Sequence, residues 1–493
     1  MALLSEPAWR IRAIHDRPPH AAGAFVLYWM IGARRPTWNL ALDRAIDWAD
    51  ELSKPLVVLE ALRCDYQWAS DRFHQFVIDG MRANAAAFAD AGIDYYPYLE
   101  PAPRAGRGLL QALADAAAVV VTDRTPVFDL AGLVEAAARH IRVRFEEVDG
   151  YGIVPLDAPA SVFPTAYAFR RYLQRSLREF LPVKPRATLT RTRDRRLTMP
   201  LTATIKERWP SARLEESEWP TALAALPVDH SVGIAPQAGG HAAAGRALDV
   251  FMADRLRAYD ERSHPDADVS SGLSPYLHFG HISAHEVLHR VLGADEWTPE
   301  RLGQATNGSR EGWWGVSAQA EGFLDQLVTW RELGGNATRR DDYTTYQALP
   351  AWARATLEKH AADERPHTYS LDQFARADTH DPLWNAAQRE LALEGRLHNY
   401  MRMLWGKKIL EWTHTPREAL EVMVELNNRY ALDGRDPNSY SGIFWVLGRY
   451  DRPWGPERQI YGTVRYMTSE SAARKLKLKE YLRRWDGAGR RLF

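Results

Sequence analysis

The chain has 493 residues with 63 basic and 63 acidic side chains, so its net charge indicates no partner class, although a local basic patch is not excluded. Its apolar content of 46% is too high for a disordered chain, and at about 100–200 residues per domain its length predicts roughly two to three domains. The single cysteine, Cys64, excludes an intrachain disulfide and a cysteine-rich metal site. The chain contains no apolar run of about 18 residues, so we expect no membrane span.

Apolar runs bounded by turn residues alternate with helical patterns in the first part of the chain. The runs predict strands over 24–30, 55–62, 93–99, 117–126 and 141–150. This alternation predicts a Rossmann-like α/β domain over residues 1–185, with a parallel sheet whose ligands bind at the carboxyl ends of the strands. Neither a GxGxxG nor a GxxxxGK[ST] motif occurs there, so a phosphate-cradling loop is not supported.

The chain changes character after residue 185. Residues 186–245 include the basic segment RATLTRTRDRRLTMP and a segment rich in Gly and Ala, and we expect an interdomain linker there. From residue 246 to 493 helical patterns dominate without strand alternation, which predicts an all-α second domain. The helical patterns cover 249–262, 283–293, 320–333, 350–360, 381–396, 398–413 and 416–430.

A segment of small residues, VSSGLSPYLHFGHIS, spans residues 269–283. Serine hydroxyls and backbone amides that precede a helix are donors to an anion, and the helix dipole adds to the attraction. A serine-rich helix cap explains the same pattern without any ligand. The segment alone therefore leaves both an anion site and a simple cap open.

A helical stretch, HNYMRMLWGKKILEWT, spans residues 398–413 and follows the helix-breaking Gly395. Trp405 and Trp412 lie two turns apart on one face, about 10 Å along the axis. Such an aromatic stripe commonly packs into a core. Arg402 fits that interpretation poorly, because a guanidinium beside buried aromatic rings needs an acidic partner.

The segment ELNNRYALDGRDPNSYSGIFWVLGRYDRPWG, residues 425–455, is rich in amide and carboxylate side chains. Asp433 and Asp436 are candidate partners for the arginine. The segment is either a turn network or a set of hydrogen-bonding groups for a heterocycle such as a flavin or a base. Trp330 and Trp445 stand beside arginines, a pattern that suits stacking on an unpaired base with phosphates nearby.

Five segments resemble, in the same order, motifs of the photolyase/cryptochrome flavoproteins, and most closely those of the class II cyclobutane pyrimidine dimer (CPD) photolyases. They are SGLSPYLHFGHIS, THDPLWNAAQ, RMLWGKKILEW, LDGRDPNSYSG and GTVRYM. The resemblance covers nearly the whole chain and is weakest over 186–245. It implies an antenna-type α/β domain, a helical domain that holds FAD, and light-driven electron transfer from reduced FAD to a pyrimidine dimer flipped out of DNA.

The resemblance also implies functions for individual residues. Those that would hold FAD are Tyr259, Ser270, Ser271, Gly272, Leu273, Ser274, Asn399, Arg402, Asn427, Asp433 and Asp436. Those that would carry electrons to the flavin are Trp384, Trp405 and Trp412. Those that would face the lesion are Gln326, Trp330, Met403 and Trp445, and those that would contact the DNA backbone are Arg452 and Arg465.

Four positions depart from the family pattern, and together they suggest an outlying branch. Gln326 stands where the family has a glutamate that reaches the lesion and the flavin, and an amide forms hydrogen bonds without carrying charge. Leu404 replaces a frequent tyrosine, and Thr463 replaces a usual lysine, which removes one positive contact to DNA. Asn399 replaces a glycine, and we expect it to be an additional flavin ligand.

The resemblance leaves two alternatives to CPD repair. A cryptochrome-like photoreceptor would keep the electron-transfer tryptophans, and Gln326 and Thr463 favour it slightly, whereas Trp330 and Trp445 favour repair. A (6-4) photolyase is disfavoured because no histidine pair sits in a motif that resembles that group's lesion site. The basic segment 471–485 is either a solvated helix face or a nucleic-acid patch.

The resemblance further predicts UV-damaged DNA as the partner of a monomeric protein that needs no metal. We expect a cytoplasmic, nucleoid-associated location of bacterial type, because no targeting signal is visible. An antenna chromophore such as 8-hydroxydeazaflavin is a further candidate ligand of the first domain, although no local motif identifies it.

Overall fold

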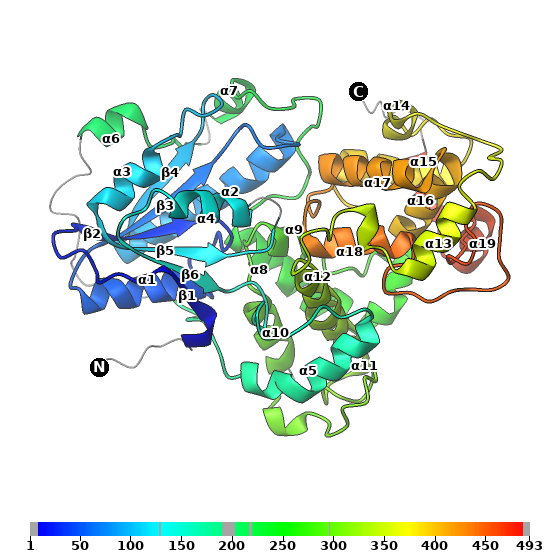
Figure 1. Cartoon of the computed structure of the whole chain (residues 1–493), viewed down its shortest axis with the longest axis horizontal. Coiled ribbons are helices and arrows are strands. Elements are labelled where there is room, and N and C mark those ends of the chain that lie inside the picture. Colours follow the sequence, from blue (N-terminus) through cyan, green and yellow to red (C-terminus); the bar gives the residue numbers. More distant parts are fainter. Residues whose placement is uncertain (1–7, 128–129, 190–202, 216–218, 295, 487–493) are drawn as a thin grey trace. The chain divides into compact units, whose positions relative to one another are not determined.

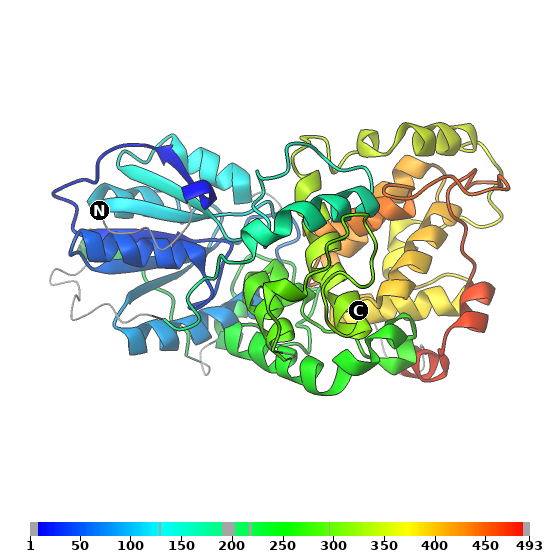
Figure 2. The same ribbon diagram turned by 90° about the horizontal axis from the view of Figure 1, so that it is seen from below.

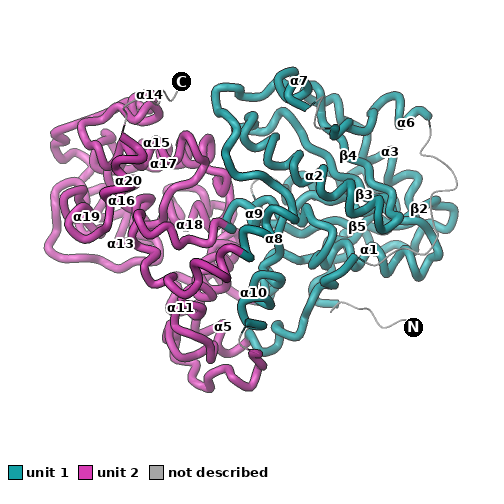
Figure 3. Tube along the Cα trace, turned by 180° about the vertical axis from the view of Figure 1, so that it is seen from behind, with its two compact units in different colours: residues 1–158, 177–249, 273–294 teal, residues 159–176, 250–272, 295–493 magenta. Residues whose placement is uncertain are grey.

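The computed structural model describes residues 8–127, 130–189, 203–215, 219–294 and 296–486. The chain divides into two compact units, coloured separately in Figure 3. Unit 1 comprises residues 1–158, 177–249 and 273–294, and unit 2 comprises residues 159–176, 250–272 and 295–493. The linker predicted over 186–245 stays a prediction, and its residues 190–202 and 216–218 lie outside the described residues.

Unit 1 contains a six-stranded sheet with the strand order β1-β6-β5-β2-β3-β4. The strands are β1 (Ile11–His15), β2 (Phe25–Met30), β3 (Leu56–Leu62), β4 (Asp94–Leu99), β5 (Ala117–Arg124) and β6 (Arg144–Asp149). Strands β2 to β6 pair in parallel, as predicted. The unpredicted β1 adds antiparallel to β6 at the edge, so the sheet is mixed. This strand has no fully buried residue, which explains why it lacks the apolar run that marks the others.

Helices cover both faces of this sheet (Figure 1). One face packs with α1 (Leu40–Glu51) and α2 (Asp71–Ala91), and the other packs with α3 (Leu109–Ala116) and α4 (Leu130–Ala138). Successive residues of β2 alternate between the two cores because strand side chains point to opposite faces. The remaining helices of the unit are α6 (Ala203–Arg208), α7 (Trp219–Ala224), α8 (His241–Val250), α9 (Ser274–His278) and α10 (Ala284–Gly293). The predicted α/β class is confirmed.

Helices are the regular secondary structure of unit 2 in its described residues, as predicted, apart from an isolated antiparallel bridge between Arg458 and Gly462. Figure 2 shows these helices in green, yellow and red. Its first half contains most of α5 (Ala166–Phe180), then η2 (Phe251–Arg255), η3 (Leu256–Ser263), η4 (Pro265–Ala267), η5 (Pro299–Arg301), α11 (Ala318–Leu324), the π-helical η6 (Asp325–Trp330) and α12 (Arg331–Ala337). Its second half contains η7 (Tyr346–Ala348), α13 (Ala351–Lys359), α14 (Leu371–Ala375), α15 (Pro382–Glu394), α16 (Asn399–Trp412), α17 (Pro416–Tyr430), α18 (Pro437–Val446), α19 (Ser469–Lys475) and α20 (Lys479–Trp485).

Strong local signals set the ends of the helices around the candidate site. Asp381 caps α15 by accepting hydrogen bonds from the backbone amides of Leu383 and Trp384, and Pro382 occupies the first turn. Gly395, with a φ of 68°, ends α15 in the left-handed conformation, so the predicted break between α15 and α16 is confirmed.

A close contact between two helices connects the segments that carry Trp330 and Trp445, the tryptophans predicted to face the lesion. Trp330 ends η6, which continues directly into α12, and Trp445 lies near the end of α18. A Cβ on Gly334 of α12 would come within 2.8 Å of the backbone of Asn438 on α18. Glycine therefore permits α12 and α18 to approach more closely than any other residue would allow.

Candidate functional site

The candidate site is centred on an ion pair between α16 and the loop after α17. Arg402 donates from one guanidinium nitrogen to both carboxylate oxygens of Asp433, at 3.0 and 3.3 Å. Its other terminal nitrogen donates to the side-chain oxygen of Asn427 at 3.3 Å. The side chains of Arg402 and Asp433 are 17% and 18% exposed, so water screens the pair only in part. The arginine therefore has the acidic partner that its aromatic surroundings require.

The amide that contacts Arg402 is itself fixed by buried neighbours. The side-chain nitrogen of Asn427 donates to the hydroxyl of Ser439 at 2.8 Å and to the side-chain oxygen of Asn428 at 3.1 Å. Asn428 in turn donates to the hydroxyl of Tyr440 at 2.9 Å. All four residues are buried, and such satisfied polar networks hold their members in one orientation.

Asp436 caps a helix in the same loop. Its carboxylate accepts a hydrogen bond from the backbone amide of Asn438 at 2.8 Å and caps the N-terminus of α18. This loop therefore contains both interpretations: Asp436 belongs to the turn network, and Asp433 belongs to the polar set around Arg402. Contact of Asp436 with a flavin stays a prediction.

The serines of the small-residue segment differ in whether they cap a helix. The residue before α9 is Leu273, and no side-chain hydrogen bond caps that helix. Ser283, at the end of the segment, caps α10 by accepting a hydrogen bond from the backbone amide of His285 at 3.0 Å. The capping interpretation therefore holds for Ser283 and not for the serines around α9. Gly272 has a φ of +67°, and a Cβ built on it would meet nothing within 4 Å. Ser270 and Ser271 belong with Gly272 to unit 2, whereas Leu273 and Ser274 belong to unit 1.

Tyr259 and Asn399, two further predicted flavin ligands, differ in burial. Tyr259 packs edge-on against Phe251 and Phe323, with ring centroids 5.7 and 5.5 Å away. Burial raises the pKa of Tyr259 to about 12, so its hydroxyl stays protonated at neutral pH. Asn399 is exposed and lies one turn before Arg402 on α16. Within the described part of the chain, neither side chain hydrogen-bonds to Arg402.

The three predicted electron-transfer tryptophans are connected in the order Trp405, Trp384, Trp412. The indole nitrogen of Trp384 donates to the backbone carbonyl of Trp405 at 3.0 Å, and its ring lies 5.9 Å from that of Trp412. All three are at most 2% exposed. The indole of Trp405 donates to the side-chain oxygen of the buried Gln388 at 2.9 Å. Trp384 on α15 therefore connects the two tryptophans of α16.

Further aromatic rings continue from Trp412 to the surface. The ring of Trp412 lies 5.6 Å from that of the half-buried Tyr369 and 5.0 Å from that of the exposed His380. The chain of rings therefore reaches from the buried α16 to a solvent-exposed side chain.

The predicted lesion-side residues are all half-buried. Gln326 and Trp330 lie on η6, Met403 lies on α16, and Trp445 lies on α18. An aromatic ring must be partly exposed to stack on a base, and Trp330 and Trp445 meet this condition. The side-chain amide of Gln326 forms no hydrogen bond within the described part of the chain.

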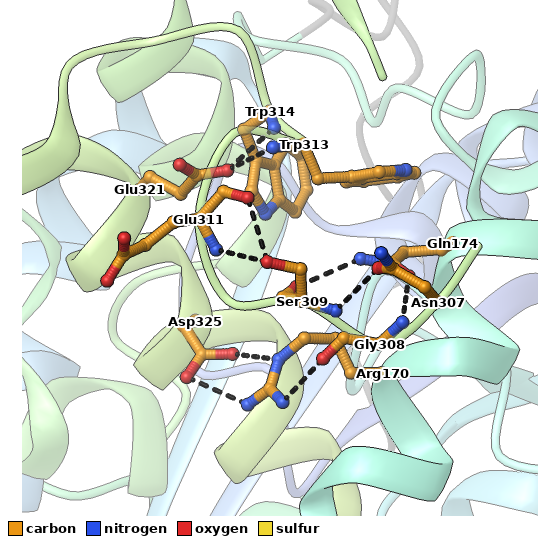
Figure 4. Close-up of polar contacts among 10 residues, drawn as sticks. All are labelled: Arg170, Gln174, Asn307, Gly308, Ser309, Glu311, Trp313, Trp314, Glu321 and Asp325. Atoms are coloured by element: carbon orange, nitrogen blue, oxygen red, sulfur yellow. Dashed lines mark hydrogen bonds and ion pairs between the residues drawn. The ribbon is translucent and has the colours of Figure 1, made fainter. Parts of the chain in front are cut away.

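The carboxylate of Asp325, the residue before Gln326, forms an ion pair with an arginine of α5. Arg170 of α5 donates two hydrogen bonds to Asp325, at 2.8 and 3.1 Å, and a third to the carbonyl of Gly308 at 3.2 Å (Figure 4). Gln174 binds the same loop through the amide of Gly308 and the carbonyl of Ser309. The side chains of Arg170 and Asp325 are both 9% exposed. Asp325 therefore does not replace the carboxylate that position 326 lacks.

The loop after α18 carries the predicted DNA-contacting arginines and one aromatic ring that the sequence analysis missed. The guanidinium carbons of Arg452 and Arg465 lie 4.3 and 4.2 Å from the ring centre of Trp454. Arg465 also lies 5.5 Å from the ring of Trp445 and 3.8 Å from the carboxylate of Asp451. The tryptophan two positions after Arg452 in RYDRPWG was the signal that could have identified this ring.

The basic segment 471–485 forms α19, α20 and the turn between them. Lys477 pairs with Glu261 at 2.9 Å, Arg483 pairs with Glu480 at 2.6 Å, and Arg484 pairs with Glu394. These pairs neutralise part of the positive charge, which favours the interpretation as a solvated helix face.

The described residues contain neither a candidate metal site nor a candidate membrane span. No group of three or more His, Cys, Asp or Glu side chains there is arranged to hold a metal ion. No helix in that part of the chain is long and apolar enough to cross a bilayer.

Sequence and structure comparisons give consistent relatives. No family model matches the chain. The deoxyribodipyrimidine photo-lyase of Methanothermobacter thermautotrophicus is 34% identical and aligns over 97% of this chain and 98% of its own. That of Oryza sativa is 32% identical and aligns over 96% and 89%. Among solved structures, a class III photolyase from Agrobacterium tumefaciens has a TM-score of 0.64 at 18% identity and covers 94% of this chain and 86% of its own. A Synechocystis cryptochrome has a TM-score of 0.61 at 15% identity, with coverages of 94% and 88%.

Proposed function

The chain belongs to the photolyase/cryptochrome family, and from this premise we propose that it is a light-dependent DNA repair enzyme that splits cyclobutane pyrimidine dimers. The observation that carries the proposal is the near full-length identity above 30% to deoxyribodipyrimidine photo-lyases. The polar cluster, the tryptophan chain and the lesion-side residues of unit 2 supply the groups that this reaction needs. The direct test is repair of an oligonucleotide with a single thymine dimer under blue light.

The family implies an FAD cofactor, and the donor set around Arg402 fits one. Arg402, Asp433 and Asn427 form a fixed group of donors and acceptors that suits the edge of a flavin ring. Gly272 has open space beside its backbone, as a segment that accommodates a bulky diphosphate needs. When bound, the photoexcited reduced flavin supplies the electron that splits the lesion. We assign the remaining predicted ligands, Tyr259 and Ser270 among them, to the same cofactor.

The chain's own residues keep this cofactor reducible. Trp405, Trp384 and Trp412 form a continuous aromatic series that ends beside the half-buried Tyr369. We propose that electrons move along this series from the surface to the flavin. Gln388 orients the indole of Trp405 through a buried hydrogen bond.

We assign the DNA side of the site to the half-buried aromatic residues and the loop after α18. Trp330 and Trp445 would stack against the flipped dimer, and Met403 would contact it. Arg452 and Arg465 would neutralise nearby phosphates, which predicts that affinity falls as salt rises.

Replacement of Gln326 by leucine is expected to lower the repair yield about tenfold. Gln326 has an amide without a hydrogen-bond partner among the described residues and stands where the family has a lesion-facing glutamate. Loss of one hydrogen bond to the reacting lesion costs about 1–1.5 kcal/mol. The measurement is dimers repaired per absorbed photon, with flavin photoreduction as the control that should not change. An unchanged yield would show that Gln326 does not contact the lesion.

Two finer assignments accompany the function. We propose that unit 1 binds an antenna chromophore such as 8-hydroxydeazaflavin, which an absorption spectrum of the purified protein would reveal beside FAD. We also propose that the protein acts as a metal-independent monomer on nucleoid DNA. A photoreceptor without repair activity is the alternative, and Gln326 and Thr463 are the residues that favour it slightly.

A further inference from the structure

Lys407 is a fully buried cation that belongs neither to the polar cluster nor to the tryptophan series. It lies on α16 and is 0% exposed. Its ammonium donates a hydrogen bond to the backbone carbonyl of Val446, the last residue of α18. The same nitrogen lies 5.3 Å from the ring centre of Trp445. A single ammonium group therefore contacts both the backbone and the side chain at the end of α18.

Burial of this cation carries a cost that an apolar side chain would avoid. Burial lowers the pKa of Lys407 to about 7, while Asp451 favours the charged form and Arg465 disfavours it. Methionine has a similar volume and needs no hydrogen-bond partner, and replacement of buried charges by apolar groups is often neutral or stabilising. A lysine at this position therefore indicates a specific interaction rather than simple packing.

The same residue is connected to the arginine-bearing loop. The hydroxyl oxygen of Tyr461 lies within hydrogen-bond distance of two acceptors, the backbone carbonyl of Lys407 at 2.8 Å and the carboxylate of Glu411 at 3.0 Å. Tyr461 lies four residues before Arg465, whose guanidinium also lies 5.5 Å from the ring of Trp445. Lys407 thus contacts both the end of α18, which carries Trp445, and the segment from Tyr461 to Arg465, whose arginine lies beside the same ring.

We propose that Lys407 is a positioning residue that fixes Trp445 for stacking on the damaged base. The protonated lysine does so through the charged hydrogen bond to Val446 and through attraction to the indole ring. A fixed ring loses less conformational freedom when it binds, so the benefit appears as preference for damaged over undamaged DNA. The proposal rests on the proposed function, because it takes Trp445 as a lesion-side residue.

The adjacent lysine provides a matched control. Lys408 is 7% exposed, pairs with Glu411 at 2.9 Å and lies 5.4 Å from the ring of Trp412. It lies on the same helix and is nearly as buried as Lys407, but within the described residues its ion pair and ring contact are with Glu411 and Trp412 and not with α18. Lys408→Met should therefore keep the wild-type preference for damaged DNA.

The test measures the ratio of Kd values for undamaged and thymine-dimer oligonucleotides, with FAD-loaded protein in the dark. Lys407→Met is expected to lower this ratio about tenfold, near the lower end of what base–aromatic stacking contributes. Trp445→Ala should lower it about ten- to hundredfold. The double variant should match Trp445→Ala alone, because Lys407 acts through that ring. If Lys407→Met acted only by destabilising the protein, it would lower the ratio of the double variant below that of Trp445→Ala alone.

A wild-type ratio in Lys407→Met, or fully multiplicative effects in the double variant, would overturn the proposal. If Lys407→Met fails to retain FAD, Lys407→Gln takes its place, since its uncharged side chain is one bond shorter. We expect that variant to have a reduced ratio, and a wild-type ratio would again overturn the proposal. A wild-type protein that shows no preference for the dimer would instead contradict the proposed function itself.

Discussion

Trp384→Phe is expected to abolish light-driven reduction of bound FAD while leaving FAD occupancy unchanged. Trp384 is the link between Trp405 and Trp412, through a 3.0 Å hydrogen bond on one side and a 5.9 Å ring contact on the other. Phenylalanine preserves the buried aromatic packing, but it is far harder to oxidise than tryptophan and has no indole donor. A barrier increase of about 3 kcal/mol already slows a step roughly 100-fold. The measurement is the bleaching of oxidised flavin absorbance under blue light with an external reductant.

Trp485→Phe is the matched control for that variant. Trp485 is also buried, at 1% exposure, but it lies at the end of α20 and outside the tryptophan series. The Trp485→Phe variant should undergo photoreduction of its FAD at the wild-type rate. Wild-type photoreduction in Trp384→Phe would show that electrons reach the flavin by another route.

Asp433→Ala is expected to lower both FAD occupancy and the free energy of unfolding. The substitution leaves the guanidinium of Arg402, which is 17% exposed, without its acidic partner. We expect a loss of about 2–3 kcal/mol, below the full cost of breaking a buried pair because Arg402 keeps partial solvation and its bond to Asn427. Denaturant unfolding gives the stability, and the flavin-to-protein absorbance ratio gives the occupancy.

Two variants separate the structural effect of Asp433 from its effect on the cofactor. Asp342→Ala removes an exposed ion pair with Arg340, whose side chains are 40% and 42% exposed, and should change stability by less than about 0.5 kcal/mol. Arg402→Met combined with Asp433→Ala removes both charges and should recover stability without recovering FAD. Full FAD occupancy in Asp433→Ala would contradict the assignment of this pair to the cofactor.

The sequence predicted those parts of the fold that follow from local patterns. The apolar runs of β2 to β6 predicted the parallel strands, and Asp381, Pro382 and Gly395 predicted the limits of α15. The edge strand β1 was not predicted, because none of its residues is fully buried and its sequence contains no apolar run. Strand pairing at an edge depends on a partner distant in sequence, which a local pattern does not contain.

Site residues could be predicted from the sequence where a charged side chain stands among aromatic neighbours. Contacts between segments distant in sequence could not be predicted in the same way. Arg402 among aromatic residues required an acid, and its pairing with Asp433 is present as expected. Trp405 and Trp412 share a helix face, but the connection through Trp384 depends on how α15 packs against α16. The contact of Lys407 with the end of α18 depends likewise on packing between helices remote in sequence.

Repair of a defined lesion tests the central claim most directly. The FAD-loaded, reduced protein is mixed with an oligonucleotide that contains one thymine dimer, and intact thymines are counted after blue light and after an equal time in the dark. We predict complete repair in the light, none in the dark, and strongly reduced repair with Trp445→Ala. A protein that binds FAD and undergoes photoreduction, yet leaves the dimer unchanged in the light, would contradict the assignment as a photolyase and favour a photoreceptor.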